Sequence, residues 1–387
     1  MAIKNLKKVV YGEESIFKEA YDATAAKKEI KTADLDIKID SVKLETTYTA
    51  IDGELSPTTS TGRKTGHLTF TKPIGKAALT NHEALIQAGL GQTDAQSNEY
   101  SVIVTKTSNK ELISTEDFAD GEIVFFDFDG AGGAGYSSFY VIDTFTTGTK
   151  VASFLTPINA VDYAKITATT TKMKSAKTIT PAKTDFDKSF CFAVQYDDDS
   201  MMIFRGASLA ITFEVVKEDK LVLNFDIMSA FAGYKDESGD IYTKVTGTIT
   251  DEIEDNMVYA DFKNSYVYDV TTSAEKEVCP YSYGLNIGHT LVKNEFLCGI
   301  KGWYSKPEIT GEIEFSKTPA NEITFDEDNE ANANNFLFFS QENFAIYAEH
   351  ARLTNANLGA MEEFDTIMLN TDVNHSTTKK LRIVFPQ

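Results

Sequence analysis

The chain has 387 residues and a net charge of −21, with 58 acidic against 37 basic residues. Proteins that hold nucleic acid tightly cluster Lys and Arg to release counterions from phosphates, so this balance argues against tight DNA binding. Its three cysteines, Cys191, Cys279 and Cys298, lack C-x-x-C spacing, which predicts neither a disulfide framework nor a zinc site. No segment has the apolar length of a membrane span or of a signal peptide. We expect a soluble protein made in the cytoplasm, with no cofactor and no membrane partner.

Residues 1–34 are expected to form an N-terminal arm. Within it, residues 13–29 favour a helix, because Phe17, Tyr21 and Ala25 recur every four positions, with acidic residues early and lysines late. The apolar stripe is thin, so an arm that becomes ordered only against a neighbour is an equal alternative.

Residues 35–95 change to an alternating pattern that predicts strands, with Leu35, Ile37 and Ile39 on one face and charged residues on the other. A turn-rich loop and a second strand follow. The next segment predicts a helix, with a capping box at Thr80 and Glu83 and terminating glycines at positions 89 and 91.

Residues 96–186 differ in composition and predict an inserted β-rich region with hairpins, joined by a flexible lysine-rich linker over residues 171–188. The region contains a literal G-x-G-x-x-G at residues 130–135. A dinucleotide site needs a helix to begin there, but residues 136–144 predict another strand. We therefore interpret the motif as a hairpin tip.

Residues 189–228 predict an antiparallel meander of three strands, each alternating apolar and polar side chains. The first turn of this meander is acidic and consists of Asp197, Asp198 and Asp199. The inward positions of the next two strands are apolar and include Leu209, Ile211, Phe213, Leu221, Leu223 and Phe225.

The sequence contains no set of residues typical of catalysis. Paired carboxylates occur, as at positions 197–199 and 326–328, but in a chain with 58 acidic residues we interpret them as solvated turns. The five histidines lack metal-binding spacing, and no G-x-S-x-G is present. We do not expect an enzyme.

One stretch of sequence is echoed later in the chain. Residues 65–72, TGHLTFTK, resemble residues 310–317, TGEIEFSK. The echo predicts two similar halves, which either build one sandwich or form two tandem sandwiches. We favour one β-sandwich made of residues 35–95 and 187–387, interrupted by the insertion. The predicted fold class is mainly β, an antiparallel sandwich or barrel with one flanking helix and an inserted β-hairpin region.

In its central part, the chain resembles the major tail tube proteins of long-tailed, siphovirus-like bacteriophages. The order of a strand, an acidic turn, Ile203-Phe204-Arg205-Gly206-Ala207 and two long strands is typical of that family. The further segments that carry the resemblance are residues 62–73, 82–90, 283–287, 307–313, 345–353 and 381–385. Residues 96–186 have no counterpart in it.

The resemblance implies a virion protein whose copies form rings, stacked into a hollow tail tube through which DNA passes during genome ejection. One sandwich per chain implies a hexameric ring, whereas two tandem sandwiches imply a trimer. We expect the acidic turn Asp197–Asp199 to lie in the lumen or between subunits, and the apolar strand residues named above to lie at inter-subunit strands. Implied partners are further copies and other tail proteins (tape measure, terminator and distal tail), with assembly in the cytoplasm of the bacterial host.

Two alternatives remain open. A carbohydrate- or receptor-binding β-sandwich on a virion or cell surface is compatible with the 17 Tyr and 26 Phe residues, and requires an exposed aromatic groove. A glycosidase requires a carboxylate of raised pKa in a cleft.

Overall fold

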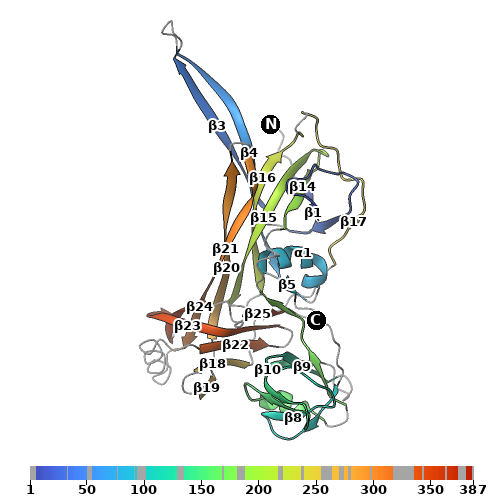
Figure 1. Cartoon of the computed structure of the whole chain (residues 1–387), viewed down its shortest axis with the longest axis vertical. Helices are drawn as coiled ribbons and strands as arrows, with labels where there is room; N and C mark the ends of the chain where they lie inside the picture. The colour runs from blue at the N-terminus through green and yellow to red at the C-terminus, as the bar shows by residue number, and fades with distance from the viewer. Residues whose placement is uncertain are drawn as a thin grey trace.

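The computed structural model describes the chain apart from residues 1–5, 33, 50–54, 76, 91, 94–101, 129–134, 168–169, 181–187, 217–220, 237–238, 254–263, 270–273, 278–279, 297–298, 317–334, 342–343, 362–363, 374–380 and 386–387. The molecule is elongated, with a long hairpin at one end and a separate small sheet at the other (Figure 1). Antiparallel strands dominate, so the predicted mainly β class is confirmed. The larger sheet contains 18 strands and forms a half-barrel.

Seven strands of the large sheet form a first repeat. In chain order they are β1 (Leu6–Glu13), β2 (Lys27–Ile30), β3 (Asp36–Thr49), β4 (Leu55–Pro73), β14 (Phe190–Tyr196), β15 (Met201–Val216) and β16 (Val222–Gly233). Hydrogen bonding places them side by side in the order β2-β1-β14-β15-β16-β4-β3, and every pair is antiparallel.

Seven later strands form a second repeat. They are β18 (Asn264–Asp269), β19 (Ala274–Glu277), β20 (Pro280–Phe296), β21 (Gly299–Ser316), β22 (Asn335–Gln341), β23 (Phe344–Met361) and β24 (Phe364–Val373). Their spatial order is β19-β18-β22-β23-β24-β21-β20. Taken strand by strand, chain order and pairing are the same as in the first repeat.

The two repeats also agree in register. Gly66 lies opposite Ile39 and Ser229, and its counterpart Gly311 lies opposite Leu285 and Thr371. The same offset holds through the echoed strands, which are β4 and β21. The chain therefore contains two tandem seven-stranded units. Our expectation of one sandwich interrupted by an insertion is corrected, because each echoed strand has its own complete set of partners.

The main core lies between the first repeat and α1 (Ala78–Leu90). This helix begins two residues before the predicted capping box, and a kink at His82 separates its first turn from the rest. Gly89 lets the helix approach β15 closely: a Cβ atom there would lie 2.4 Å from Cγ1 of Ile211 and 2.7 Å from Cδ1 of Leu209. The apolar face of the sheet is thus sealed by a helix that has no room for a larger residue at this point.

The N-terminal residues do not form the predicted helix or a detached arm. β1 is hydrogen-bonded to β14 on one side and to β2 on the other, and residues 14–26 form an irregular loop between β1 and β2. The apolar side chains of that loop pack individually. Tyr21 meets the Tyr242 ring edge-on at 5.5 Å, and Phe17 lies against Gly206. Contacts with distant strands override the helical spacing.

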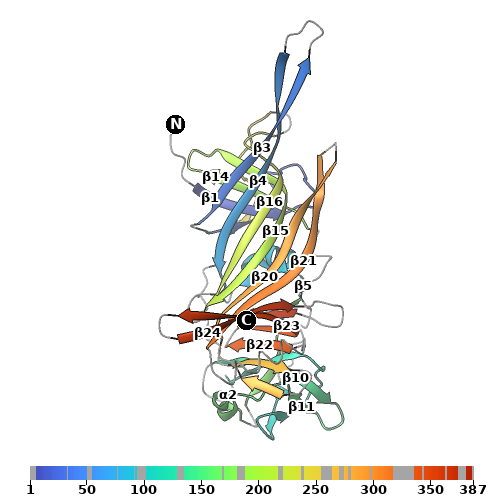
Figure 2. The same cartoon turned by 90° about the vertical axis from the view of Figure 1, so that its left-hand side faces the viewer.

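The inserted region forms a sheet of seven strands in the order β6-β12-β9-β10-β11-β8-β7. These are β6 (Val102–Ile103), β7 (Thr105–Lys106), β8 (Glu111–Ile113), β9 (Ile123–Asp127), β10 (Tyr136–Thr146), β11 (Val151–Phe154) and β12 (Lys172–Ser175). They enclose a core of their own together with α2 (Ala160–Lys165). A further apolar cluster joins β9 and β10 to β23 (Figure 2).

The predicted flexible linker, residues 171–188, contains two strands. β12 belongs to the inserted sheet, and β13 (Thr178–Thr180) pairs with β5 (Gln92–Thr93) and with β25 (Leu381–Val384) in the large sheet. Strand pairing therefore holds both described parts of the segment, and residues 181–187 lie outside the described residues. The glycine motif also lies largely outside them. It joins the antiparallel strands β9 and β10, so no helix begins after it.

Candidate functional site: the sheet edges and the polar face

The two repeats meet edge to edge in one continuous sheet. β15 uses one of its edges twice: its first half pairs with β14 and its second half pairs with β20 of the second repeat. The register of this internal joint runs from Ile211 opposite Ile287 to Val216 opposite Ser282. Because β20 is the last strand of its repeat, the joint connects an inner strand of one repeat to the end strand of the other.

The two strand edges that correspond to this joint, those of β3 and β23, are not paired with each other within the described part of the chain. β3 corresponds to β20 and pairs only with β4 there. β23 corresponds to β15, and its first half pairs with β22 and β25, but along residues 352–361 its only described partner is β24. Among the described residues, one backbone edge therefore remains unpaired at each end of the row of strands.

The free edge of β3 carries an apolar side chain in water. Ile39 is 38% exposed, although its neighbour Ile37 packs against the main core. An unpaired strand edge with an exposed β-branched residue is a site where another strand can add.

One face of the first repeat packs on the main core; the other carries a small apolar cluster on β1, β14 and the first half of β15 and is polar along β3, β4 and β16. On β16, the alternation places Leu223, Phe225 and Ile227 inward and Asp226 in water. His67 of β4 contacts the Asp226 carboxylate across the strands, and Thr71 Oγ1 donates to Asn224 at 3.1 Å. The charged or titratable residues on this face whose side chains are described are Asp36, Lys38, Asp40, His67 and Asp226. Three of these five are acidic, and we call this surface the polar face.

The predicted acidic turn lies at the tip of the β14–β15 hairpin. Asp197, Asp198 and Asp199 are all exposed there. The Asp199 carboxylate accepts from the Lys7 ammonium and from the Gln195 amide, both at 3.0 Å. Hydrogen bonds from these two groups hold its pKa below the ordinary value. The turn is thus tied to β1.

The predicted inter-subunit strands are internal. The side chains of Leu209, Ile211, Leu221, Leu223 and Phe225 are buried in the main core. Both edges of β15 and both edges of β16 are paired within the chain, by β14, β20 and β4 as well as by each other. This prediction is corrected: alternation identified buried strands but not which strands end the sheet. The side chain of Phe213 lies outside the described residues.

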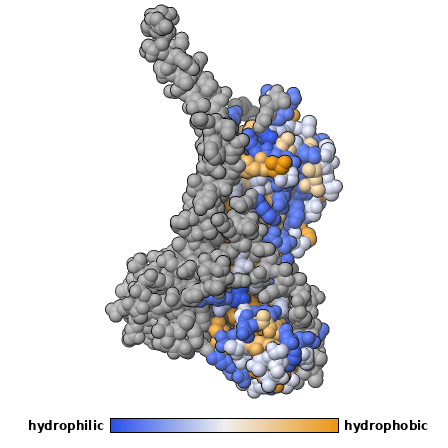
Figure 3. Space-filling view, viewed as in Figure 1, coloured by the Kyte–Doolittle hydropathy of each residue, from blue (hydrophilic) through white to orange (hydrophobic). Residues whose placement is uncertain are grey.

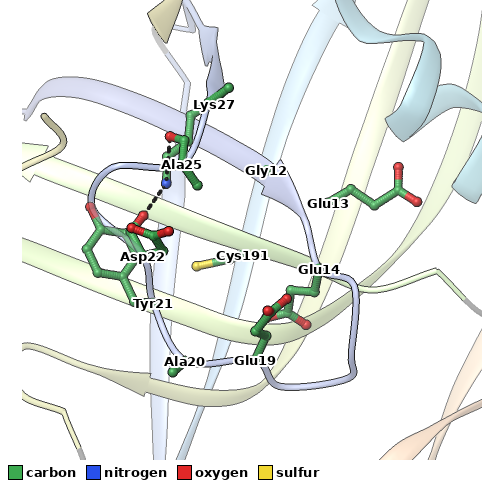
Figure 4. Close-up of a pocket in the computed structure, with 11 residues that line it drawn as sticks. Gly12, Glu13, Glu14, Glu19, Ala20, Tyr21, Asp22, Ala25, Lys27 and Cys191 are labelled. Atoms are coloured by element: carbon green, nitrogen blue, oxygen red, sulfur yellow. Dashed lines mark hydrogen bonds between the residues drawn. The ribbon is translucent and has the colours of Figure 1, made fainter. Parts of the chain in front are cut away.

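A pocket of about 130 Å³ lies beneath the loop between β1 and β2 (Figure 4). The Cys191 thiol points into it between Tyr21 and the carboxylates of Glu14 and Glu19. Burial raises the pKa of Cys191 to about 12, so the thiol is protonated at neutral pH and is a poor nucleophile.

Glu14 has a structural role in the wall of this pocket. Its carboxylate accepts hydrogen bonds from the backbone N–H of Gly206 at 2.9 Å, from the N–H of Lys18 at 3.0 Å and from the Ser189 hydroxyl at 2.7 Å. Burial raises its pKa, and these bonds oppose the rise. Gly206 has φ +59°, a conformation that suits glycine. The carboxylate therefore fixes the loop to the point of β15 where Gly206 adopts a left-handed conformation.

Glu252, in the segment that leads from the first repeat to the second, makes polar contacts with three residues of the first repeat and α1. Its Oε1 lies 2.6 Å from the Lys72 ammonium and 3.2 Å from Nε2 of His82, and its carboxylate accepts from the backbone N–H of Lys31 at 2.6 Å. Burial alone would raise the pKa of Glu252, but these contacts outweigh it and lower the pKa to about 2. The adjacent Ile253 exchanges two backbone-to-amide hydrogen bonds with Asn81 of α1. Sequence reasoning missed this residue because its partners are distant in the chain.

No group of His, Cys, Asp and Glu suited to a metal ion occurs among the described residues. No described helix has the length and hydropathy needed to cross a membrane. On the face seen in Figure 3, apolar colour on the described surface is divided into small spots among polar areas. Residues 326–328, the second carboxylate set, lie outside the described residues.

No protein-family model matches the chain, and no curated protein matches it in sequence.

Proposed function

We propose that the chain is the structural subunit of a hollow tube built from stacked rings, as the resemblance to phage tail tube proteins implies. The observation that carries the proposal is the construction of the large sheet. Two repeats of the same topology are already joined edge to edge, and one free edge remains at each end. A unit with two different complementary ends associates head to tail, and such contacts generate closed rings when the rotation closes.

The repeat bears on the number of copies in a ring. A tail-tube-like ring made of six repeats needs six chains with one repeat each or three chains with two. Because this chain carries two repeats, we propose three copies per ring rather than the hexamer expected from a single sandwich.

The polar face supports the second part of the proposal, which is that this face lines the channel. A conduit must not hold the DNA that moves through it, because weak attractions of about 1 kcal/mol per contact would add up over many phosphates. The acidic excess of the polar face supplies repulsion instead, and the helix α1 packs on the opposite, apolar face of the sheet. DNA passes without tight binding, and the chain resides in the tail of a virion assembled in the host cytoplasm.

The long hairpins offer contacts between rings. β3–β4 extends far beyond the body of the molecule, and β20–β21 points toward the same end (Figures 1 and 2). Antiparallel pairing continues along β3–β4 as far as Thr49 opposite Leu55. Hairpins of this length, directed along one axis, can reach a neighbouring ring. Contacts with the proteins that end the tube and that occupy its channel would be made by the same surfaces at the first and last rings.

Sedimentation velocity over a concentration series, with negative-stain microscopy of the same samples, tests the proposal. Concentration-dependent species that appear as annuli or short tubes are the expected result. A monomer at every concentration contradicts it, and retention of that monomer on immobilised polysaccharide would favour the carbohydrate-binding alternative.

A further inference from the structure

The internal joint between the repeats shows how two copies of the chain can meet. In that joint the second half of β15 pairs with β20, whose counterpart in the other repeat is β3. The counterpart of β15 is β23. The correspondence is fixed residue by residue. Ile211 lies opposite Phe225, which lies opposite Phe70, and Leu358 lies opposite Ile367, which lies opposite Phe315. Because Phe70 and Phe315 occupy the same place in the two echoed stretches, Leu358 is the counterpart of Ile211.

We propose that β3 of one copy pairs antiparallel with the second half of β23 of the next copy, in the register of the internal joint. Transferring that register places Leu358 opposite Ser41, Gly359 opposite Asp40, Ala360 opposite Ile39 and Met361 opposite Lys38. The proposal rests on the proposed assembly into rings and specifies the surface through which it occurs.

The two edges are chemically compatible. Residues 353–361 read LTNANLGAM and carry no charge, in a chain whose net charge is −21. Asp40 of the incoming strand, which the register places opposite Gly359, therefore meets no like charge directly across the new pair, where such repulsion would oppose pairing. Ile39, which is 38% exposed in the single chain, takes the position held by Leu285 in the internal joint, opposite Ala360 instead of Phe213.

The same joint is not formed within the described part of one chain, where β3 and the second half of β23 lie at opposite ends of the row of strands. Following the pairings, β3 and β23 are separated by seven inter-strand steps (β3-β4-β16-β15-β20-β21-β24-β23) of about 4.8 Å each. A disulfide requires Cα atoms within about 7 Å. A covalent link between the two edges thus reports a contact between copies.

The test is a disulfide between Ile39→Cys and Ala360→Cys, introduced together into a chain whose three native cysteines are replaced by serine. Mild oxidation of concentrated protein is expected to give a reducible ladder of linked copies. The control pair combines Ile39→Cys with Thr354→Cys, which in the proposed register lies several residues, at about 3.3 Å each, from the opposite position. The control pair should remain unlinked.

A second variant addresses the edge without oxidation. Ile39→Lys places a charge on the strand edge, a feature that natural sheets use to prevent pairing, and should abolish assembly while circular dichroism stays unchanged. Ile241→Lys, at a residue that is 68% exposed and outside both repeats, should assemble normally. Rings that form while the matched cysteines stay unlinked, or that survive Ile39→Lys, would overturn the edge assignment but leave the tube proposal standing. Absence of rings in every variant and in the unmodified chain would overturn both.

Discussion

Replacing Glu252 with Gln should destabilise the protein strongly at neutral pH and hardly at all in acid. The substitution keeps the size of the side chain but leaves the Lys72 ammonium, whose side chain is 10% exposed, without its carboxylate partner. Removing one partner of a buried ion pair leaves an uncompensated charge, which is far more costly than loss of an exposed pair.

The magnitude follows from the pKa of Glu252. The ordinary value is 4.5 and the folded value is about 2. A difference of one pKa unit corresponds to about 1.4 kcal/mol, so ionised Glu252 contributes about 3 kcal/mol to the free energy of unfolding. Because the folded pKa is the lower one, this contribution is complete above the unfolded pKa of 4.5 and is lost as pH falls toward 2. At pH 3 about 1 kcal/mol should remain.

The assay is urea unfolding of dilute, monomeric protein at pH 7, 5 and 3, compared between the natural chain and Glu252→Gln. Asp251→Asn is the matched control, since the Asp251 side chain is 75% exposed and lies 3.9 Å from Lys8. The control should change stability by less than about 1 kcal/mol. A Glu252→Gln deficit that is small at pH 7, or that is the same at pH 7 and pH 3, would refute the reasoning.

Three further substitutions test the packing and the chemistry of the first repeat and the inserted sheet. Gly89→Ala should lower the free energy of unfolding by about 1 to 2 kcal/mol, because crowding against β15 outweighs the better helix propensity, whereas Gly148→Ala, with open space around it, should have little effect. Cys191, in a chain whose other two cysteines are serine, should react with a thiol reagent at pH 8 far more slowly when folded than in urea; equal rates would contradict its burial. Asp162→Ala should cost about 2 to 3 kcal/mol and expose the inserted sheet to proteolysis, since it removes the acceptor of the Tyr140 hydroxyl at 2.7 Å; unchanged protease resistance would contradict this role.

Local patterns sufficed to predict the elements whose contacts are near in sequence. The meander β14–β15–β16 and the final strand β25 follow from alternation, and the helix α1 was predicted from a capping box and from the glycines at positions 89 and 91. The N-terminal segment was predicted wrongly because its apolar residues pack singly on strands more than 180 residues away, a contact that no local period reveals.

The duplication was visible only in part. The echo of residues 65–72 in residues 310–317 marked one strand of each repeat. In the first repeat the glycine is required where the strand passes Phe204, because a Cβ on Gly66 would lie 2.5 Å from that ring. The remaining six strands of each repeat differ in their side chains but share the same pairing. Backbone pairing tolerates most apolar and polar substitutions, so topology outlasts sequence. The free edges, and with them the candidate assembly surface, could therefore not be located from sequence.

The central claim is that copies of this chain close into a ring around an open channel lined by the polar face. Electron cryo-microscopy of the assembled protein tests it most directly. We predict a hollow tube with three copies per ring, with Asp36 and Asp226 facing the channel and the helix α1 on the outside. A solid filament, or a ring in which α1 faces the centre and the polar face lies outward, would contradict the account.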